Sequence, residues 1–368
     1  MTEIDLGFSG SLTTDAGSFK LLELPPELCK LVETAVENLS PLRLTIKGQS
    51  GEDAVLCTDK ATYAIRSVSR SVGESDIDTV VIRDQVNEIL ELTPVVPKLH
   101  KLSVLLRGRE YDDVHDSEDQ PSSEPEGGGL TYAAARATIQ ASDAELARGL
   151  RQQRILDIHG ALRPIAPGYL ATILETILNL LVSQSMAPHA VPVEDVAATL
   201  ADENEISRAV SMQVMSWFGE IVAGVWTMDV EGVLKEIGLG ILRHHKDDPI
   251  AKDTLLDKWK LAVGDTFEAS VSLSLLSGNY LMSPGSALGG GDLLTYFPSS
   301  ALPVDPASRF VDLFLTRPRW KADDIAPFLS DIAINTKDRD KLLLKYTRAT
   351  TDNAAVWYTK KVDTRYGR

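Results

Sequence analysis

Residues 317–361 read RPRWKADDIAPFLSDIAINTKDRDKLLLKYTRATTDNAAVWYTKK, and this stretch has the clearest secondary-structure pattern of the chain. Apolar residues recur at helical spacing over residues 323–332 and again over 337–348. Residues 356–359 then alternate as in a β-strand. This order of helix, turn, helix and strand predicts a winged helix at the end of the sequence, over residues 305–368.

The second of these helices is predicted to have one basic face. At roughly 100° per residue, its four cations fall within about 80° of the circumference: Lys337, Lys341, Lys345 and Arg348. Leu343 and Tyr346 fall on the opposite side, so one face packs and the other is positive. Residues 309–368 hold 13 Lys and Arg against 8 Asp, on a chain of formal net charge −16. Any contact with nucleic-acid phosphate must therefore be local to this region.

Basic residues occur where a winged helix contacts the nucleic-acid backbone, on its third helix and near its wing. The candidate DNA-binding residues are Arg317, Arg319, Lys321, Lys337, Lys341, Lys345, Arg348, Lys360, Lys361 and Arg365. No Asn, Gln or Arg set suited to reading base edges is evident, so we expect phosphate contact with little sequence preference. An ordinary solvated face opposite a packed stripe is the alternative interpretation.

A pattern of three helices followed by a β wing recurs upstream every 60–70 residues, which predicts tandem winged helices. We expect modules at residues 97–166 and 167–229, and a degenerate one at 230–300. Independent helical bundles would give a similar period. Residues 110–129, EYDDVHDSEDQPSSEPEGGG, are acidic and poor in large apolar residues, so we expect a disordered insertion, with an acidic docking tract as the alternative.

Residues 1–96 favour β structure, with short β-prone runs between turn residues and one helix after Pro25 and Pro26. A small sheet of five or six strands leaves edges that need a cover or a partner strand. We expect a heterodimerisation domain whose partner-facing or core residues are Leu42, Leu44, Ile46, Val55, Leu56, Tyr63 and Ile65. The predicted fold class is therefore α+β, a small β domain followed by winged helices.

Catalytic and metal-binding signatures are missing from the sequence. There is no P-loop and no recognisable nucleophile–base pattern, so we expect no enzyme, no cofactor and no metal. Gly238-Leu239-Gly240 lacks the third glycine of a dinucleotide motif and is interpreted as a helix interruption or a tight packing point. On a helix, the side chains of His244 and His245 would diverge by roughly 100°, which argues against a shared metal ion. We therefore interpret them as residues at a helix C-terminus, where cations are favourable.

The cellular setting is predicted from cysteines and hydropathy. Cys29 and Cys57 form no CxxC motif and fit a reducing compartment. The first residues, MTEIDLGF, lack the positive start and apolar core of a signal peptide. No run approaches the roughly 20 apolar residues of a membrane span. We expect an intracellular, soluble protein with no membrane partner.

Several blocks of the chain resemble one known family. The most specific are AVLCTDKATYAIRSVSRS (54–71), RFVDLFLTRPRW (309–320), DIAPFLSDI (324–332) and LLLKYTRAT (342–350), with shorter similarities at IQASDAEL (139–146) and LLDKWKLAV (255–263). These blocks are similar to the sister chromatid cohesion protein Dcc family, an accessory subunit of the alternative, chromosome transmission fidelity, replication factor C clamp loader. The resemblance covers nearly the whole chain.

The resemblance implies a non-enzymatic nuclear adaptor. Its β domain would form a composite β-barrel with the small chromosome-transmission-fidelity subunit and the C-terminal end of the large subunit. Tandem winged helices would follow, the last of which bind DNA. The family also docks onto DNA polymerase epsilon and assists loading or unloading of the sliding clamp PCNA. It is usually described with three winged helices, whereas the pattern above gives four, so we expect the first or third to be degenerate or a linking module.

Two functions from other classes stay open at this point. One is a winged-helix transcription regulator, which would prefer one DNA sequence over bulk DNA by roughly 10³ or more. The other is a hydrolase with an unrecognised site, which would require perturbed carboxylates or histidines gathered in one cleft.

Overall fold

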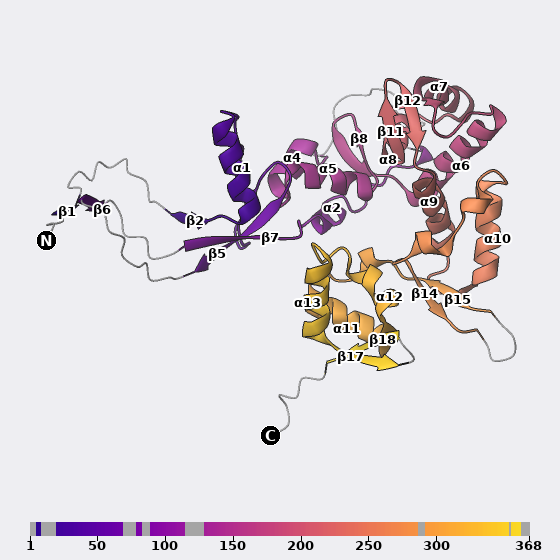
Figure 1. Cartoon of the computed structure of the whole chain (residues 1–368). Helices are drawn as coiled ribbons and strands as arrows, with labels where there is room; N and C mark the ends of the chain where they lie inside the picture. The colour runs from indigo at the N-terminus through magenta and orange to yellow at the C-terminus, as the bar shows by residue number, and fades with distance from the viewer. Residues whose placement is uncertain are drawn as a thin grey trace. The chain divides into compact units, whose positions relative to one another are not determined.

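The computed structural model describes residues 5–8, 20–68, 79–82, 89–114, 129–285, 291–352 and 355–361. The chain divides into two compact units, which we call the sheet unit and the helical unit (Figure 1). The sheet unit comprises residues 1–99 and 136–147, and the helical unit residues 100–135 and 148–368. An N-terminal sheet followed by several helices confirms the α+β class. Most of the acidic insertion, residues 115–128, lies outside the described residues.

The sheet unit contains one five-stranded sheet. Its strands lie in the order β2 (Leu21–Glu23), β7 (Ile89–Pro94), β5 (Thr62–Val68), β4 (Val55–Cys57) and β3 (Thr45–Lys47). β2 runs parallel to β7, and the other neighbours are antiparallel. Helix α1 (Pro26–Glu37) carries Pro26 in its first turn and buries Leu28 in one core with Leu56, Tyr63 and Leu92.

Two features of the sheet unit go beyond the sequence analysis: strand β7, and the partner of the β-prone run at residues 79–82. β7, between β2 and β5, was missed because Leu92 is its one buried residue, so the apolar alternation is weak. A separate parallel pair joins β1 (Asp5–Phe8) to β6 (Thr79–Ile82). The five-stranded sheet therefore ends in two edge strands, β2 and β3.

Residues 136–147 belong to the sheet unit although they are distant from its strands in sequence. The Nζ of Lys47 donates a hydrogen bond to the Ala141 carbonyl at 2.7 Å, and Nε2 of Gln140 donates to the Asp53 carbonyl at 2.8 Å. The Thr62 hydroxyl on β5 donates to the buried Glu145 carboxylate at 2.6 Å. These side chain contacts tie the 136–147 segment to β3, to the residues just before β4, and to β5.

Three consecutive runs of the helical unit share one order of elements: helix, short strand, further helices, hairpin. The first run contains α6 (Pro167–Ser183), β10 (Val191–Pro192), α7 (Val193–Asn204), α8 (Arg208–Trp217), β11 (Gly219–Val222) and β12 (Val225–Met228). The second contains α9 (Val230–Arg243), β13 (Ile250–Ala251), α10 (Lys252–Val263), η1 (Glu268–Ser270), η2 (Leu273–Leu276), β14 (Tyr280–Ser283) and β15 (Leu293–Tyr296). After η3 (Ser299–Ala301), the third contains α11 (Pro306–Thr316), β16 (Arg319–Lys321), α12 (Ala322–Ile325), η4 (Ala326–Leu329), α13 (Thr336–Tyr346), β17 (Thr347–Asp352) and β18 (Ala355–Lys360).

The sheets of the three runs also share one topology. In each run the short first strand pairs with the last strand of the hairpin, giving the orders β10-β12-β11, β13-β15-β14 and β16-β18-β17. All of these pairs are antiparallel. A recurrence of element order and strand pairing is therefore present in these three runs, which correspond to the last three of the four predicted modules.

The elements that precede these runs are α2 (His100–Leu105), α4 (Tyr132–Thr138), α5 (Asp143–Gln152), β8 (Ile155–Ile158) and β9 (Ala161–Pro164). β8 and β9 form a two-stranded antiparallel hairpin, as the sequence predicts. The boundary between the sheet unit and the helical unit falls inside α4 and again inside α5.

Two segments with apolar residues at helical spacing do not form a regular helix. Residues 267–276 form the short 3-10 turns η1 and η2, because serines such as Ser272 and Ser274, whose hydroxyls lie 2.8 Å apart, favour local hydrogen bonds over a helix. Residues 323–332 form α12 followed by η4, and Pro327, which has no backbone N–H to donate, lies at the start of η4.

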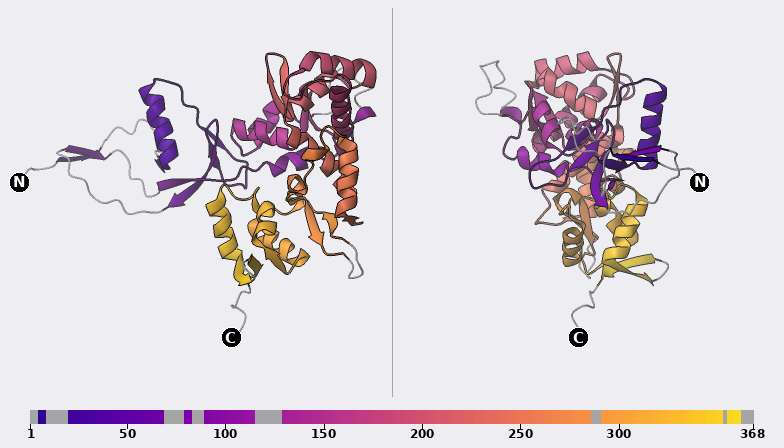
Figure 2. Two further views of the ribbon diagram at one scale, coloured as in Figure 1. Left: turned by 45° about the vertical axis from the view of Figure 1, so that its right-hand side comes forward. Right: turned by 90° about the vertical axis from the view of Figure 1, so that its left-hand side faces the viewer.

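In the described residues, the three runs of the helical unit pack around two hydrophobic cores. One joins the first and second runs and includes the buried rings of Trp226 and Trp259. The other belongs to the third run and includes Phe310, Trp320 and Phe328. Both views of Figure 2 show the third run, in the last colours of the bar, as a lobe of its own within the helical unit. The candidate basic residues lie on this lobe.

Candidate functional site

Helix α13 displays three of the predicted cations. Lys337, Lys341 and Lys345 are exposed, whereas Leu343 is buried in the core of the third run. The helix begins at a capped end, because the Asn335 side chain oxygen accepts a hydrogen bond from the Asp338 backbone N–H at 3.0 Å. For these lysines, the packed and positive faces predicted from the sequence are both present.

Arg348 is not part of this helical face, contrary to the prediction. α13 ends at Tyr346, and Arg348 lies on β17, paired with Thr359 of β18. The Thr347 backbone is already extended, and its hydroxyl donates to the Leu343 carbonyl at 2.6 Å. The β-branched threonines of the sequence TRATTD favour a strand here, which ends the helix earlier than the charge pattern indicates.

Carboxylates share α13 with the lysines. Asp338 forms a 2.9 Å ion pair with Lys341, and Asp340 forms one of 3.2 Å with Arg339. Leu344 is 76% exposed on the same helix. α13 is therefore a mixed surface, less positive than its lysines alone would make it.

The solvent face of the third sheet gathers a second basic group, which we call the basic sheet face: Arg319, Lys321, Arg348 and Trp357. Lys321 pairs with Trp357 across β16 and β18. The neighbouring residues Trp320 and Tyr358 point to the core, so strand alternation turns this set outward. The sequence analysis missed Trp357, although the alternation of Val356-Trp357-Tyr358 places it opposite the packed tyrosine.

Cation–π contacts organise the basic sheet face. The Arg319 guanidinium lies 4.3 Å from the centre of the Trp357 ring, and the Lys321 ammonium lies 5.5 Å from it. Arg319 also forms a 3.2 Å ion pair with Asp352, in which both side chains are exposed. The indole is partly exposed between positive charges.

The remaining predicted cations take different positions. Arg317 is half-buried, donates a hydrogen bond to the Met282 carbonyl and lies 5.2 Å from the Trp320 ring centre. Burial lowers the pKa of its guanidinium. The Arg317 side chain is therefore occupied by contacts within the protein. Lys360 and Lys361 are exposed at the end of β18, and Arg365 lies outside the described residues.

The predicted partner residues separate into exposed and buried sets. Ile46, on the edge strand β3, is 67% exposed, and Leu44 beside it is 42% exposed. Val55, Leu56 and Tyr63 are buried on β4 and β5. Two further residues are partly covered: Leu42, and Ile65 against the core. Of the predicted partner residues, Leu44 and Ile46 are therefore the ones that are exposed at the β3 edge, while the buried residues support the sheet.

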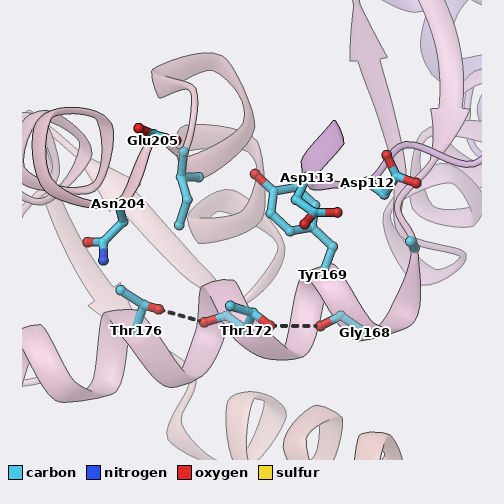
Figure 3. A pocket seen from close by; sticks show the side chains of 10 residues that line it. Asp112, Asp113, Gly168, Tyr169, Thr172, Thr176, Asn204 and Glu205 are labelled. Carbon is cyan, nitrogen blue, oxygen red and sulfur yellow. Dashed lines mark hydrogen bonds between the residues drawn. The ribbon is translucent and has the colours of Figure 1, made fainter. Parts of the chain in front are cut away.

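The helical unit has an open polar hollow of about 590 Å³ beside α6 (Figure 3). It is lined by Asp112, Asp113, Ala166, Gly168, Tyr169, Thr172, Thr176, Asn204, Glu205 and Ile206. The hydroxyls of Thr172 and Thr176 donate to carbonyls one turn earlier on α6, at 3.2 and 2.8 Å (Figure 3). The lining contains no histidine, cysteine or lysine, so it offers no pair of nucleophile and nitrogen base.

A second hollow, of about 610 Å³, lies between α6, α9 and α10. Burial raises the pKa of Glu175, Arg243 and Lys258 supply positive charge around it, and His244 also lines the hollow. α9 continues through Gly238, where an added Cβ would lie 2.5 Å from Trp259, so the tight-packing interpretation is confirmed and the helix interruption is wrong. α9 ends at Arg243, which confirms His244 at a helix C-terminus.

The described ranges contain neither a cluster of metal ligands nor a membrane-spanning helix. No group of three or more His, Cys, Asp or Glu residues there could hold a metal ion. Among the helices of those ranges, none combines the length and the apolar character needed to cross a membrane.

Comparisons with known proteins agree on one family. The sequence model described as Sister chromatid cohesion protein Dcc1 matches residues 19–329. The chain is 24% identical over 380 residues to Sister chromatid cohesion protein DCC1 of Homo sapiens, covering 97% of this chain and 92% of that protein. It is 26% identical over 372 residues to the protein of the same name from Xenopus laevis, covering 95% and 90%. Probable sister chromatid cohesion protein DCC1 of Dictyostelium discoideum is 25% identical over 332 residues, covering 84% and 86%.

Proposed function

Because this chain belongs to the sister chromatid cohesion protein Dcc1 family, we propose that it acts in sister chromatid cohesion as a non-enzymatic subunit of an alternative replication factor C clamp loader. In this role it bridges the loader to DNA and to the catalytic subunit of DNA polymerase epsilon in the nucleus. It thereby assists loading or unloading of PCNA. The family match over residues 19–329 carries the proposal.

The sheet unit is the proposed assembly surface for the small and large chromosome-transmission-fidelity subunits. The exposed apolar side chains of Leu44 and Ile46 lie at the β3 edge, where backbone groups face no further strand of the described sheet. A strand from a partner completes such an edge and covers its apolar residues. This support favours a composite β-barrel shared with partner chains.

The three runs of the helical unit are proposed to be winged helices. Each combines helices with a hairpin and a short strand in one three-stranded sheet. We place these modules at 167–229, 230–300 and 305–368, the second with its third helix reduced to 3-10 turns. Residues 97–166 form a further module, in which Tyr111 bridges to Ile165 beside the β8–β9 hairpin.

DNA contact is proposed for the third run. Its exposed cations lie on α13, on the basic sheet face and at Lys360 and Lys361. Lysine and arginine on such a surface neutralise phosphates without reading sequence. This distribution favours an adaptor over a sequence-specific transcription regulator.

A pull-down tests the assembly proposal. The tagged full chain, expressed in eukaryotic cells, is expected to recover clamp-loader subunits identified by mass spectrometry. Ile46→Asp places a charge on the β3 edge and should abolish this recovery, because burying an unpaired carboxylate against a partner is costly.

Leu261→Asp is the matched control. Leu261 on α10 is 85% exposed, so the same kind of substitution should leave the recovered proteins unchanged. Recovery of clamp-loader subunits by both variants would show that β3 is not part of the interface. Their absence from the wild-type pull-down would overturn the proposed function.

A further inference from the structure

We propose that Arg319 and Trp357 form a stacking platform for an unpaired base, which makes the third run prefer single-stranded over double-stranded DNA. The inference deepens the proposed function and rests on its claim that this run contacts DNA. It names the form of DNA and the residues that select it.

The platform is already assembled in the protein. The Arg319 guanidinium, 4.3 Å from the Trp357 ring centre, is held on β16 while Trp357 is held on β18, and the two strands are paired. A flat guanidinium over an indole presents π surface and positive charge together. Unpaired bases stack on both aromatic side chains and arginine planes.

Cations near the platform suit a single strand that carries its phosphates across the sheet. Lys321 lies 5.5 Å from the Trp357 ring centre, and Arg348 is on the same solvent face of the sheet. Lys360 and Lys361 continue the positive charge at the end of β18. Binding of single strands commonly combines such a charged track with stacking side chains.

Duplex DNA would gain less from this surface. The bases of a duplex are stacked on one another, so none is free to lie on the Arg319–Trp357 pair. Insertion of α13 into a groove would bring Asp338 and Asp340 close to phosphates, and these carboxylates offset Lys341 and Arg339. The sheet therefore provides a contact that only an unpaired base can use.

Asp352 reduces the attraction of the platform for phosphate. Its carboxylate lies 3.2 Å from the Arg319 guanidinium on the exposed side of the sheet, where it competes with an incoming phosphate. Asp352→Asn removes this competition and should strengthen binding of both single and double strands. It separates charge from stacking, because it leaves Trp357 in place.

Fluorescence anisotropy with labelled oligothymidine and a mixed-sequence duplex of equal length tests the preference on the full chain. The wild type should bind the single strand more tightly. Trp357→Ala should weaken single-strand binding about tenfold or more, and duplex binding less than about twofold. Trp357→Phe keeps an aromatic ring and should retain most of the affinity.

Val356→Ala, 39% exposed on the opposite face of β18, is the matched control and should bind both DNAs as the wild type does. Equal weakening of single-strand and duplex binding by Trp357→Ala would overturn the platform while leaving DNA contact intact. So would equal wild-type affinity for the two DNAs. Wild-type chain that binds neither DNA would overturn both the platform and the proposed DNA contact.

Discussion

At the scale of single residues, Arg309 shows how the third run is held together. Its side chain is fully buried on α11. Nε donates to the Pro303 carbonyl at 2.6 Å, and Nη1 to the Phe328 carbonyl at 2.8 Å. Both Nη atoms also bond the Asp331 carboxylate, which forms a bidentate pair. One cation thus links the segment before α11 to η4 and the turn after it.

Replacing Arg309 should therefore loosen the whole third run. Arg309→Met fills a similar volume but leaves the carbonyls of Pro303 and Phe328 without donors and Asp331 without its partner. We expect a loss of about 3 kcal/mol or more. Hydrogen exchange of peptides from residues 299–346 measures this as faster local opening.

Arg339→Met is the control for this prediction. Arg339 forms an ion pair with the exposed Asp340 on the surface of α13, so its loss should cost less than about 1 kcal/mol. Equal exchange rates in the two variants would show that the Arg309 network adds no stability.

At the scale of elements, a capping box joins α5 to the sheet unit. The Ser142 hydroxyl accepts from the Glu145 backbone N–H at 3.2 Å, and the Glu145 carboxylate accepts from the Ser142 backbone N–H at 2.9 Å. The Thr62 hydroxyl bonds both partners, at 2.6 Å to Glu145 and 3.0 Å to the Ser142 N–H. A local helix cap is thereby locked to β5.

Thr62→Val keeps the shape of this side chain and removes its hydroxyl. The buried Glu145 carboxylate then loses its shortest hydrogen bond, so unfolding of the sheet unit should become easier by about 1–3 kcal/mol. Urea unfolding, with hydrogen exchange at Ser142 and Glu145, measures the change. Thr34→Val makes the same substitution on the exposed side of α1 and should change stability little; an equal loss would contradict the prediction.

The elements that could be predicted are those specified by local sequence. Ser142 followed by Glu145 has the spacing of a capping box, and this local pattern alone predicts the observed cap and the start of α5. Asp253 followed by Asp257 has a similar local pattern and would predict a cap there, but α10 begins at Lys252 after Ala251. Short strands such as β16 escape prediction, since pairing with the distant β18 stabilises them more than their own residues do.

The candidate site was also predicted only in part, because local sequence does not show which distant strands pair. Helical spacing correctly places Lys337, Lys341 and Lys345 on an exposed face. It cannot show that Arg348 joins Arg319 across a sheet, because strand register brings them together over 29 positions of sequence. The residues predicted to face a partner include both the exposed Ile46 and the buried Tyr63, because β-propensity does not indicate which side chains of a strand are exposed.

At the scale of the whole molecule, charge is strongly segregated. The chain has a formal net charge of −16, yet residues 309–368 carry more basic than acidic residues. Binding to DNA phosphates then depends on where the positive charges lie rather than on their total number. Two variants with the same net charge can separate these possibilities.

The first variant changes Lys337, Lys341, Lys345 and Arg348 to Glu, and the second changes Lys235, Lys246, Lys258 and Lys260 to Glu, all exposed. Each set removes the same amount of positive charge, taking the net charge from −16 to −24. The first should weaken DNA binding strongly and make the slope of log affinity against log salt shallower by roughly 2–4, because local phosphate contacts and their released counterions are lost. The second should change the slope by less than about one. Filter binding over a salt series measures both, and equal slopes would show that long-range repulsion, not the third run, controls contact with DNA.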